Sequence, residues 1–231
     1  QRLYAAKPTA EEIASCEAQG AYLPTAQEIQ RVEDIIAGCK ALADYLRASL
    51  KIGAVQIGWA AMAPKTSFMV TNNVDEFRAL LVSNDYTQYD FYQVDPHNGD
   101  LFAAKTENSV MSNPDFMQRV HDEGFTDIYF AGFQATECAL GSGLKDTVME
   151  KFKESALGIQ TAIISNLSAD TFGGKSVFRP MPSEQAVLEI LHRSGARVVT
   201  TYECIAEIHF HLGRPGAALS NAADSSAKPF I

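Results

Sequence analysis

One cysteine stands where an apolar strand passes through a short turn into a helix. The stretch Asp127–Ala131 (DIYFA) predicts the strand, Gly132 opens the turn, and Cys138 follows at the start of the predicted helix. A helix amino terminus carries a partial positive charge and unpaired backbone N–H groups. Both stabilise a thiolate, and the N–H groups can also hold an oxyanion. Cys138 is therefore a candidate nucleophile, and the alternative is a small buried hydrophobic residue.

A lysine occupies the equivalent place after another predicted strand. Lys105 directly follows Leu101–Ala104 (LFAA). The carboxyl ends of parallel strands share one edge of a sheet, so Lys105 is expected on the same rim as Cys138. An ammonium group there would stabilise a thiolate. The alternative is an ordinary surface lysine after a strand.

Aromatic side chains are the candidates for a substrate pocket on this rim. Trp59, Phe133 and Tyr202 each fall near the end of a predicted strand or the start of a helix. Each also fits a place in the hydrophobic core, so both interpretations stay open. The four cysteines include no C-x-x-C pair, which argues against a zinc knuckle or a thioredoxin-like motif.

Strands and helices alternate along the chain, and Thr25 and Glu28 form a capping box at the start of the longest helix. Helices are expected at 9–19, 25–49, 73–83, 114–124, 136–154, 183–192 and 201–212, and strands at 54–59, 101–104, 127–131, 160–165 and 197–200. This alternation predicts an α/β fold with three layers, α/β/α, around a mainly parallel, Rossmann-like sheet.

The domain prediction is a single α/β domain over residues 1–212, of which 1–24 form an atypical amino-terminal segment. Residues 213–231 are rich in Gly, Ala, Ser and Pro. They are expected to be a tail that is disordered or lies over a partner.

Charge and hydropathy exclude several partners. The net charge of −9 argues against binding to nucleic acid or to an anionic membrane, which needs clustered Lys and Arg. No apolar run approaches the roughly 18–20 residues that a membrane span requires. The sequence does not fix the compartment, and a cytoplasmic protein is favoured. A processed or exported form is the alternative, because the chain starts at Gln1 rather than at methionine.

Two motifs in order carry a family resemblance. The first is Gly99–Ser109 (GDLFAAKTENS), and the second is Gly132–Cys138 (GFQATEC) after an intervening helix and strand. The stretches Gly158–Asp170 (GIQTAIISNLSAD) and Arg197–Ile208 (RVVTTYECIAEI) follow at the expected spacing. Over residues 25–212 the chain resembles the isochorismatase-like cysteine hydrolases.

The resemblance implies a three-layer α/β fold and a catalytic triad of Asp, Lys and Cys. Lys105 and Cys138 match two of its members. Backbone N–H groups near Glu137 and Cys138 would form the oxyanion hole, and a non-proline cis peptide is expected at Gln134–Ala135. The family also implies a small-molecule substrate, no organic cofactor and a homo-oligomer, in which the tail would clasp a neighbouring subunit.

The aspartate of that triad has no counterpart in the sequence. Its usual place is the end of the first strand, for which Arg2–Ala6 (RLYAA) is the candidate, and the expected position holds Ala5, Ala6 or Lys7. The aspartate is then lost, lies upstream of Gln1, or is replaced by another carboxylate. The replacement candidates are Glu11, Glu12 and Glu107.

The metal site of the nicotinamidase branch is also missing its ligands. The matching stretch is Gly58–Phe68 (GWAAMAPKTSF), in which Gly, Ala and Lys stand at the ligand positions. The sequence therefore predicts no metal site of this kind.

The leading hypothesis is a cysteine hydrolase of a small amide or a related C–N or C–O bond, with Cys138 as nucleophile and Lys105 in support. A second hypothesis is a catalytically silent relative that binds a small molecule or a protein, because the aspartate is not found. A third is a redox-sensing thiol protein built on Cys138.

Overall fold

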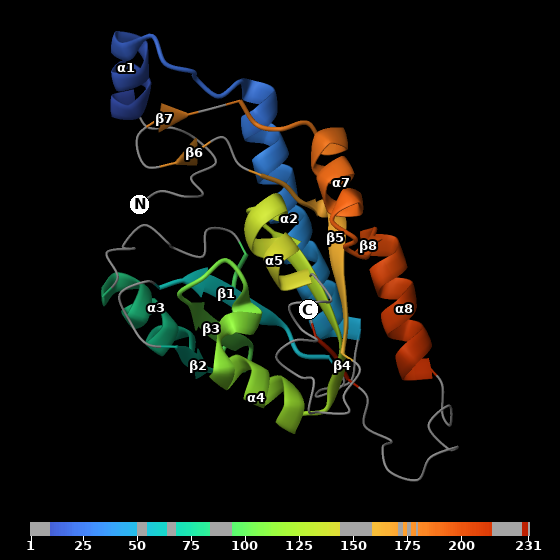
Figure 1. Ribbon diagram of the computed structural model, residues 1–231. Helices are drawn as coiled ribbons and strands as arrows, with labels where there is room; N and C mark the ends of the chain where they lie inside the picture. The colour runs from blue at the N-terminus through green and yellow to red at the C-terminus, as the bar shows by residue number, and fades with distance from the viewer. Residues whose placement is uncertain are drawn as a thin grey trace.

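The computed structural model describes residues 10–49, 55–63, 68–83, 94–143, 159–170, 173–174, 177–178, 180–213 and 228–230. Figure 1 shows helices on both sides of central strands. The elements are α1 (Ala10–Gln19), α2 (Ala26–Ser49), β1 (Gly58–Met62), β2 (Met69–Thr71), α3 (Val74–Ser83), β3 (Leu101–Lys105), η1 (Val110–Ser112), α4 (Pro114–Asp122), β4 (Phe125–Gly132), η2 (Ala135–Ala139), α5 (Leu140–Gly143), β5 (Gln160–Ser168), β6 (Gly173–Gly174), β7 (Val177–Phe178), α7 (Glu184–Arg193), β8 (Val198–Val199), α8 (Thr201–Gly213) and β9 (Lys228–Phe230).

The strands form parallel ladders, as the alternation of strands and helices predicts. One sheet has the order β8-β5-β4-β9, and all its pairs are parallel. A second sheet has the order β1-β3-β2, in which β1 runs parallel to β3 and β2 runs antiparallel. The strands β6 and β7 form a separate, antiparallel two-stranded sheet.

Alternate side chains of the strands pack against helices on opposite faces. On one face, Tyr129 of β4 and Ala162 and Ile164 of β5 contact α2 and α8. On the other face, Ile163 of β5 packs against α7. The face of β3 that carries Phe102 packs against α3. Helices thus cover both faces of the strands, and the three-layer α/β/α prediction is confirmed.

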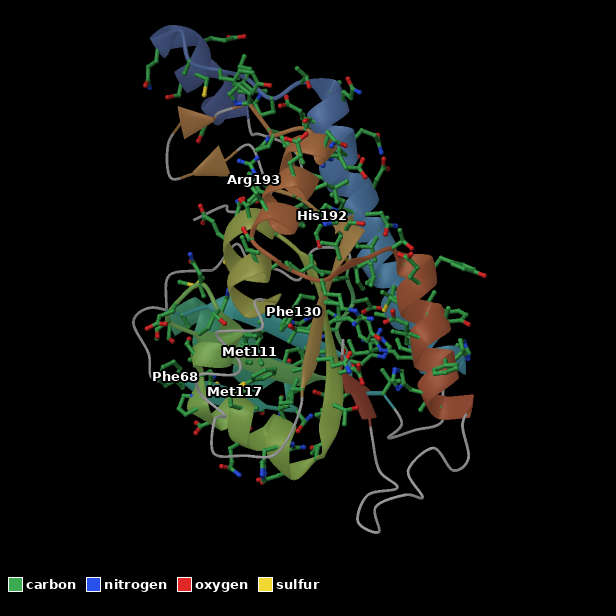
Figure 2. The ribbon with its side chains drawn as sticks, turned by 45° about the vertical axis from the view of Figure 1, so that its right-hand side comes forward. Phe68, Met111, Met117, Phe130, His192 and Arg193 are labelled. Carbon is green, nitrogen blue, oxygen red and sulfur yellow. The ribbon has the colours of Figure 1, made fainter. Side chains whose placement is uncertain are left out.

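Helix α4 joins the two sheets. Its buried side chains Phe116, Met117 and Val120 pack in one cluster with residues of both β3 and β4. Met111 belongs to the same cluster and Phe130 packs against it (Figure 2). Burial of this apolar surface, worth about 25 cal/mol per Å², holds β3 beside β4 although no described ladder connects them directly.

Local capping signals place the helix boundaries close to the predicted ones. In the capping box of α2, Thr25 N and Oγ1 both donate to Glu28 Oε2 at 2.8 Å, and Glu28 N donates back to Thr25 Oγ1 at 3.2 Å. Asn113 caps α4 through bonds from Asp115 N and Phe116 N, with Pro114 at the first helical position. Thr9, the first residue of the helix expected at 9–19, lies outside the described residues.

Several predicted boundaries differ from the structure. The strand expected at 54–59 is β1 at Gly58–Met62, because its ladder with β3 begins only at the Gly58–Leu101 pair. The antiparallel strand β2 was not expected. The helix expected at 136–154 begins as a π-turn at Ala135 and is described only as far as Gly143.

The carboxyl-terminal segment differs as well. Residues Lys228–Phe230, expected to belong to a disordered or partner-bound tail, form β9 and pair in parallel with β4 of the same chain. None of the helices in the described ranges is long and apolar enough to cross a membrane.

Glu28 fastens the start of α2 to the segment before α7. Besides its capping bonds it accepts from Tyr22 Oη and, through Oε1, from Met181 N at 2.8 Å. Burial disfavours the charge of Glu28, but the hydrogen bonds from Tyr22, Thr25 and Met181 outweigh burial and lower its pKa to about 2. The ionised carboxylate is therefore the form that stabilises the fold.

A lowered pKa makes this contribution depend on acid pH. It is fully present above the unfolded-state pKa, about 4.3, and is lost as the pH falls toward about 2. We predict that Glu28→Gln lowers the thermal midpoint at pH 7 by several degrees, corresponding to about 1 kcal/mol after allowance for solvent screening. Thermal unfolding by circular dichroism at pH 7 and pH 2.5 measures this.

The matched control is Glu17→Gln, an exposed residue of α1. The difference in thermal midpoint between Glu28→Gln and the wild type should be smaller at pH 2.5 than at pH 7. The thermal midpoint of Glu17→Gln should equal that of the wild type at both pH values. A thermal midpoint of Glu28→Gln that is lower than the wild-type value by the same amount at both pH values would contradict the role assigned to the charge.

Candidate active site

Three strands end at one edge of the structure, and each is followed by a polar or reactive residue. Strand β3 ends with Lys105, β4 ends at Gly132 before Cys138, and β5 ends at Ser168 before Asp170. Because β4 and β5 are parallel neighbours, the Cys138 turn and Asp170 lie at the same edge. Lys105 also reaches this edge, since its ammonium group interacts with Cys138.

The ammonium group of Lys105 is buried and held by two partners. Only 5% of the residue is exposed. Its Nζ donates to the carbonyl oxygen of Asn108. Burial lowers the pKa of Lys105 below its ordinary value, and the charge interaction and hydrogen bond with Cys138 partly oppose this effect. The structure thus brings the two predicted catalytic residues together and excludes the surface-lysine interpretation.

The Cys138 turn has an unusual backbone. The peptide bond between Phe133 and Gln134 is cis, one bond before the predicted Gln134–Ala135 position. Residues Ala135–Ala139 then form one turn of π-helix, in which Ala139 N donates to Gln134 O at 3.0 Å. The π-turn leads directly into α5, so Cys138 lies in the first turn of the helical segment, as predicted. Its side chain is half-buried.

The segment after β5 holds this turn from one side. Ala169 N donates to Gly132 O at 3.2 Å, and Ala169 O accepts from Ala135 N at 3.1 Å. Asp170 Oδ1 accepts from Thr136 N at 2.9 Å, and its Oδ2 accepts from Thr136 Oγ1 at 2.5 Å. Asp170 was not among the predicted site residues. Its place in the stretch after a predicted strand was the only sequence signal for it.

Ser142 holds the turn from the other side. Its Oγ donates to Cys138 O at 2.8 Å and accepts from Val110 N at 3.1 Å. Val110 begins η1, the short helix that follows Lys105 and is capped by Ser109. One buried hydroxyl therefore links the cysteine turn to the lysine loop.

The predicted oxyanion donors differ in availability. The N–H of Ala135 donates to Ala169 O at 3.1 Å and so serves to hold the turn. Gln134 contributes its carbonyl as an acceptor for Glu137 N and Ala139 N. Glu137 N lies 3.4 Å from that carbonyl, beyond the usual range of about 2.7–3.2 Å. The N–H of Glu137 is weakly engaged and remains a candidate.

Trp59 lies away from the site. It is paired with Phe102 in the ladder, whereas Lys105 is paired with Met62 three residues later. Its Nε1 donates to Asp100 Oδ2 at 2.7 Å. The indole is fixed near the amino end of β3 and packs against apolar clusters there, which fits the core interpretation of Trp59.

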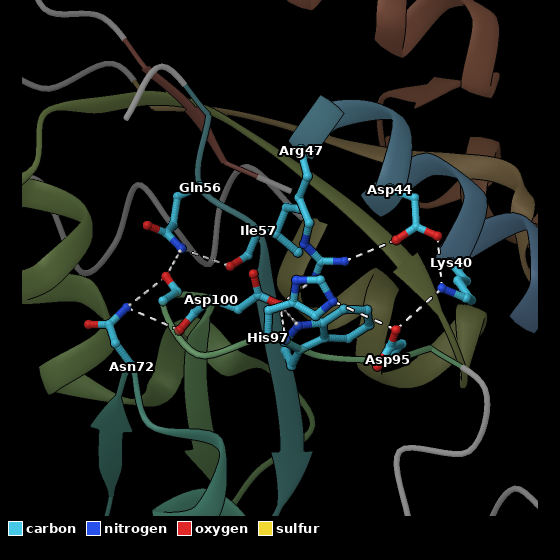
Figure 3. A network of polar contacts seen from close by, with 11 residues as sticks. Lys40, Asp44, Arg47, Gln56, Ile57, Asn72, Asp95, His97 and Asp100 are labelled. Carbon is cyan, nitrogen blue, oxygen red and sulfur yellow. Dashed lines mark hydrogen bonds and ion pairs between the residues drawn. The ribbon is translucent and has the colours of Figure 1, made fainter. Parts of the chain in front are cut away.

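Asp100 is the centre of a polar network at that amino end (Figure 3). Its Oδ2 also accepts from Arg47 Nη2 at 2.5 Å and from His97 N at 3.0 Å. Arg47 in turn contacts Asp44, which pairs with Lys40. The network fastens the end of α2 to β3 and is separate from the Cys138 edge.

The other two predicted pocket residues have different surroundings. Phe133 lies in the cysteine turn and packs against Val32 and Ile36 of α2. Tyr202 is 81% exposed on α8. Only Phe133 thus adjoins Cys138, and it does so while contributing to a small apolar cluster.

The sequence candidates for the missing base do not gain support. Glu11 is exposed on α1, and Glu107 is exposed two residues after Lys105. The side chain of Glu12 and the segment Arg2–Lys7 lie outside the described residues. Within the described residues, no cluster of three His, Cys, Asp or Glu side chains is arranged to hold a metal ion.

Comparison with known proteins gives a structural likeness only. No protein-family model and no curated protein sequence matches this chain. The fold matches an isochorismatase-like hydrolase from Alkaliphilus metalliredigens at 14% identity with a TM-score of 0.54, over 77% of this chain and 84% of that one. A hydrolase of the isochorismatase family from Chromobacterium violaceum has 14% identity and a TM-score of 0.48, over 76% and 81%. Nicotinamidase PncA from Bacillus subtilis has 14% identity and a TM-score of 0.39, over 74% of this chain and 86% of that one.

The first of these likenesses establishes the fold. At 14% identity it says nothing about activity, and the two lower scores add no argument. The chain therefore has the isochorismatase-like hydrolase fold, as its motifs predicted.

Removal of the Ser142 hydroxyl tests the link between the two site segments. We predict that Ser142→Ala destabilises the protein by about 1–3 kcal/mol, because the buried Val110 N–H loses its acceptor. Urea unfolding measures this. Ser112→Ala is the matched control, since its half-buried hydroxyl bonds only the Ser109 carbonyl of its own turn. Equal losses in the two variants would contradict the role given to Ser142.

Proposed function

We propose that this chain, which has the fold of the isochorismatase-like hydrolases, is a hydrolase of that family. In this proposal Cys138 is the nucleophile, and the substrate is a small amide or a molecule with a related C–N or C–O bond. The observation that carries the proposal is the buried ammonium group of Lys105, which lies against Cys138.

A buried ammonium group beside a thiol favours the thiolate. A free thiol with a pKa of about 8.5 is only a few per cent ionised at neutral pH. Loss of hydration destabilises the ammonium group, and the attraction of a nearby negative charge offsets part of that cost. The ammonium group of Lys105 beside the sulfur therefore attracts a thiolate, which is the reactive form of a cysteine.

The chemistry follows from these two groups. The Cys138 sulfur attacks the carbonyl carbon and forms a C–S bond, and the carbonyl oxygen becomes an oxyanion. Backbone N–H groups at Glu137 and Cys138 would hold that oxyanion. The C–N bond then breaks, the amine leaves with a proton, and a thioester remains on Cys138. Water cleaves the thioester, which releases a carboxylic acid and restores the thiol.

Lys105 supplies the proton in this scheme. Lys105, as the ammonium group, gives its proton to the leaving nitrogen. The neutral amine then takes the proton of the thiol that hydrolysis of the thioester restores, which returns the starting pair. Because burial lowers the pKa of Lys105, a proton leaves this ammonium group more readily than it leaves free lysine. This role does not require the triad aspartate that the sequence lacks.

Substitution of the nucleophile tests the proposal directly. Purified protein is incubated with a panel of small primary amides, and ammonia release is measured with a coupled assay. Cys138→Ala should reduce hydrolysis of any amide that the wild type accepts to the level of the uncatalysed reaction. Cys39→Ala is the control, because burial raises the pKa of that thiol to about 12 and keeps it unreactive.

Two outcomes would count against the proposal. One is residual hydrolysis in Cys138→Ala at the wild-type rate. The other is equal loss of activity in Cys138→Ala and Cys39→Ala when both variants are folded.

Removal of the ammonium group tests its assigned role. We predict that Lys105→Met lowers the rate of Cys138 alkylation by iodoacetamide at pH 7.5 severalfold, because the positive charge that attracts the thiolate is removed. Peptide mapping by mass spectrometry locates and quantifies the label. Lys40→Met is the control, because that lysine pairs with Asp44 on the surface of α2. A Lys105→Met rate equal to that of Lys40→Met would refute the assignment.

A further inference from the structure

The two residues after β5 grip the turn that presents Cys138. The backbone of Ala169 bonds on both sides of the turn, to Gly132 and to Ala135. The carboxylate of Asp170 adds two bonds to Thr136. All four bonds therefore act on the five residues that immediately precede Glu137 and Cys138.

Asp170 is largely buried, with 8% of the residue exposed. A buried carboxylate requires hydrogen-bond donors, and here the backbone and the side chain of Thr136 supply one to each oxygen. Such charge-assisted bonds are about twice as strong as bonds between neutral groups. Thr136 is consequently fixed in both its backbone and its side chain, two residues before the sulfur.

We propose that Asp170 is a positioning residue of the Cys138 site, which acts through Thr136 to set where the sulfur and the neighbouring N–H groups lie. This inference rests on the proposed function. It assigns Asp170 a role in geometry and not in proton transfer.

The charge of Asp170 does not account for thiolate formation. A carboxylate near the start of the helical segment opposes a second negative charge there, because like charges repel. A benefit from Asp170 must therefore come from its hydrogen bonds. That distinction separates the effects of two substitutions at this position.

Asp170→Asn retains the oxygen that accepts from Thr136 N and places an amide donor toward Thr136 Oγ1. It keeps the geometry and removes the charge. Asp170→Ala removes both bonds. Thr136→Val keeps the backbone bond and loses the hydroxyl bond, and Thr136→Ser keeps both.

The measurement uses p-nitrophenyl acetate, which acylates a reactive cysteine and releases p-nitrophenolate. Stopped-flow absorbance gives the rate constant of the first turnover for each variant, and circular dichroism confirms folding. We expect Asp170→Ala to slow acylation at least about tenfold, in keeping with the cost of a small displacement of reacting groups. Asp170→Asn should stay within about threefold of the wild type under the same geometric requirement.

Thr136→Val keeps the test decisive if Asp170→Ala does not fold. It should slow acylation relative to Thr136→Ser in a folded protein. Acylation of Asp170→Ala or of Thr136→Val at the wild-type rate would overturn the inference. If Asp170→Asn slowed acylation as much as Asp170→Ala does, the inference would also be overturned, because charge and not geometry would then matter. A wild type no faster than free cysteine would instead overturn the proposed function itself.

Discussion

The cost of burying one ammonium group organises this site. Lys105 ends a strand whose five residues are all buried, so its side chain leaves water when β3 packs. An isolated buried charge is strongly unfavourable unless it is paired and hydrogen-bonded. The carbonyl of Asn108 and the sulfur of Cys138 provide that compensation. The two segments that carry these partners must therefore be held in place.

The fold holds the cysteine segment from both sides. Ser142 connects it to the loop that follows β3, and the segment after β5 connects it to the neighbouring strand. Packing of α4 against both β3 and β4 holds the two strands beside each other. The polar network around Asp100 anchors β3 at its other end. The lysine and the cysteine thus approach each other because rigid elements on each side leave little freedom.

The extent to which the sequence predicted this structure depends on how local each signal is. The capping box of Thr25 and Glu28 and the Asn113–Pro114 start of α4 are short patterns, and both helices begin where these patterns indicated. Lys105 and Cys138 could be placed on one edge because each follows an apolar strand in a parallel sheet.

Signals that depend on distant partners were misread or missed. Trp59 is fixed by Asp100, 41 residues away, so the sequence alone left its pocket and core interpretations both open. Val55 and Ile57 suggested an earlier start of β1, but they pack into the core before the ladder begins at Gly58. Asp170 meets Thr136 only through the register of β4 and β5, which sets the two segments side by side. That register cannot be seen in the sequence around Asp170.

The central claim is that Cys138 carries the acyl group during hydrolysis. The most direct test is to quench the protein with acid during turnover of p-nitrophenyl acetate and to locate the acetyl group by peptide mapping with mass spectrometry. The account predicts an acetyl thioester on the peptide that contains Cys138, and predicts its absence in Cys138→Ala. An acetyl group found only on another residue, or an unmodified Cys138 during sustained turnover, would contradict it.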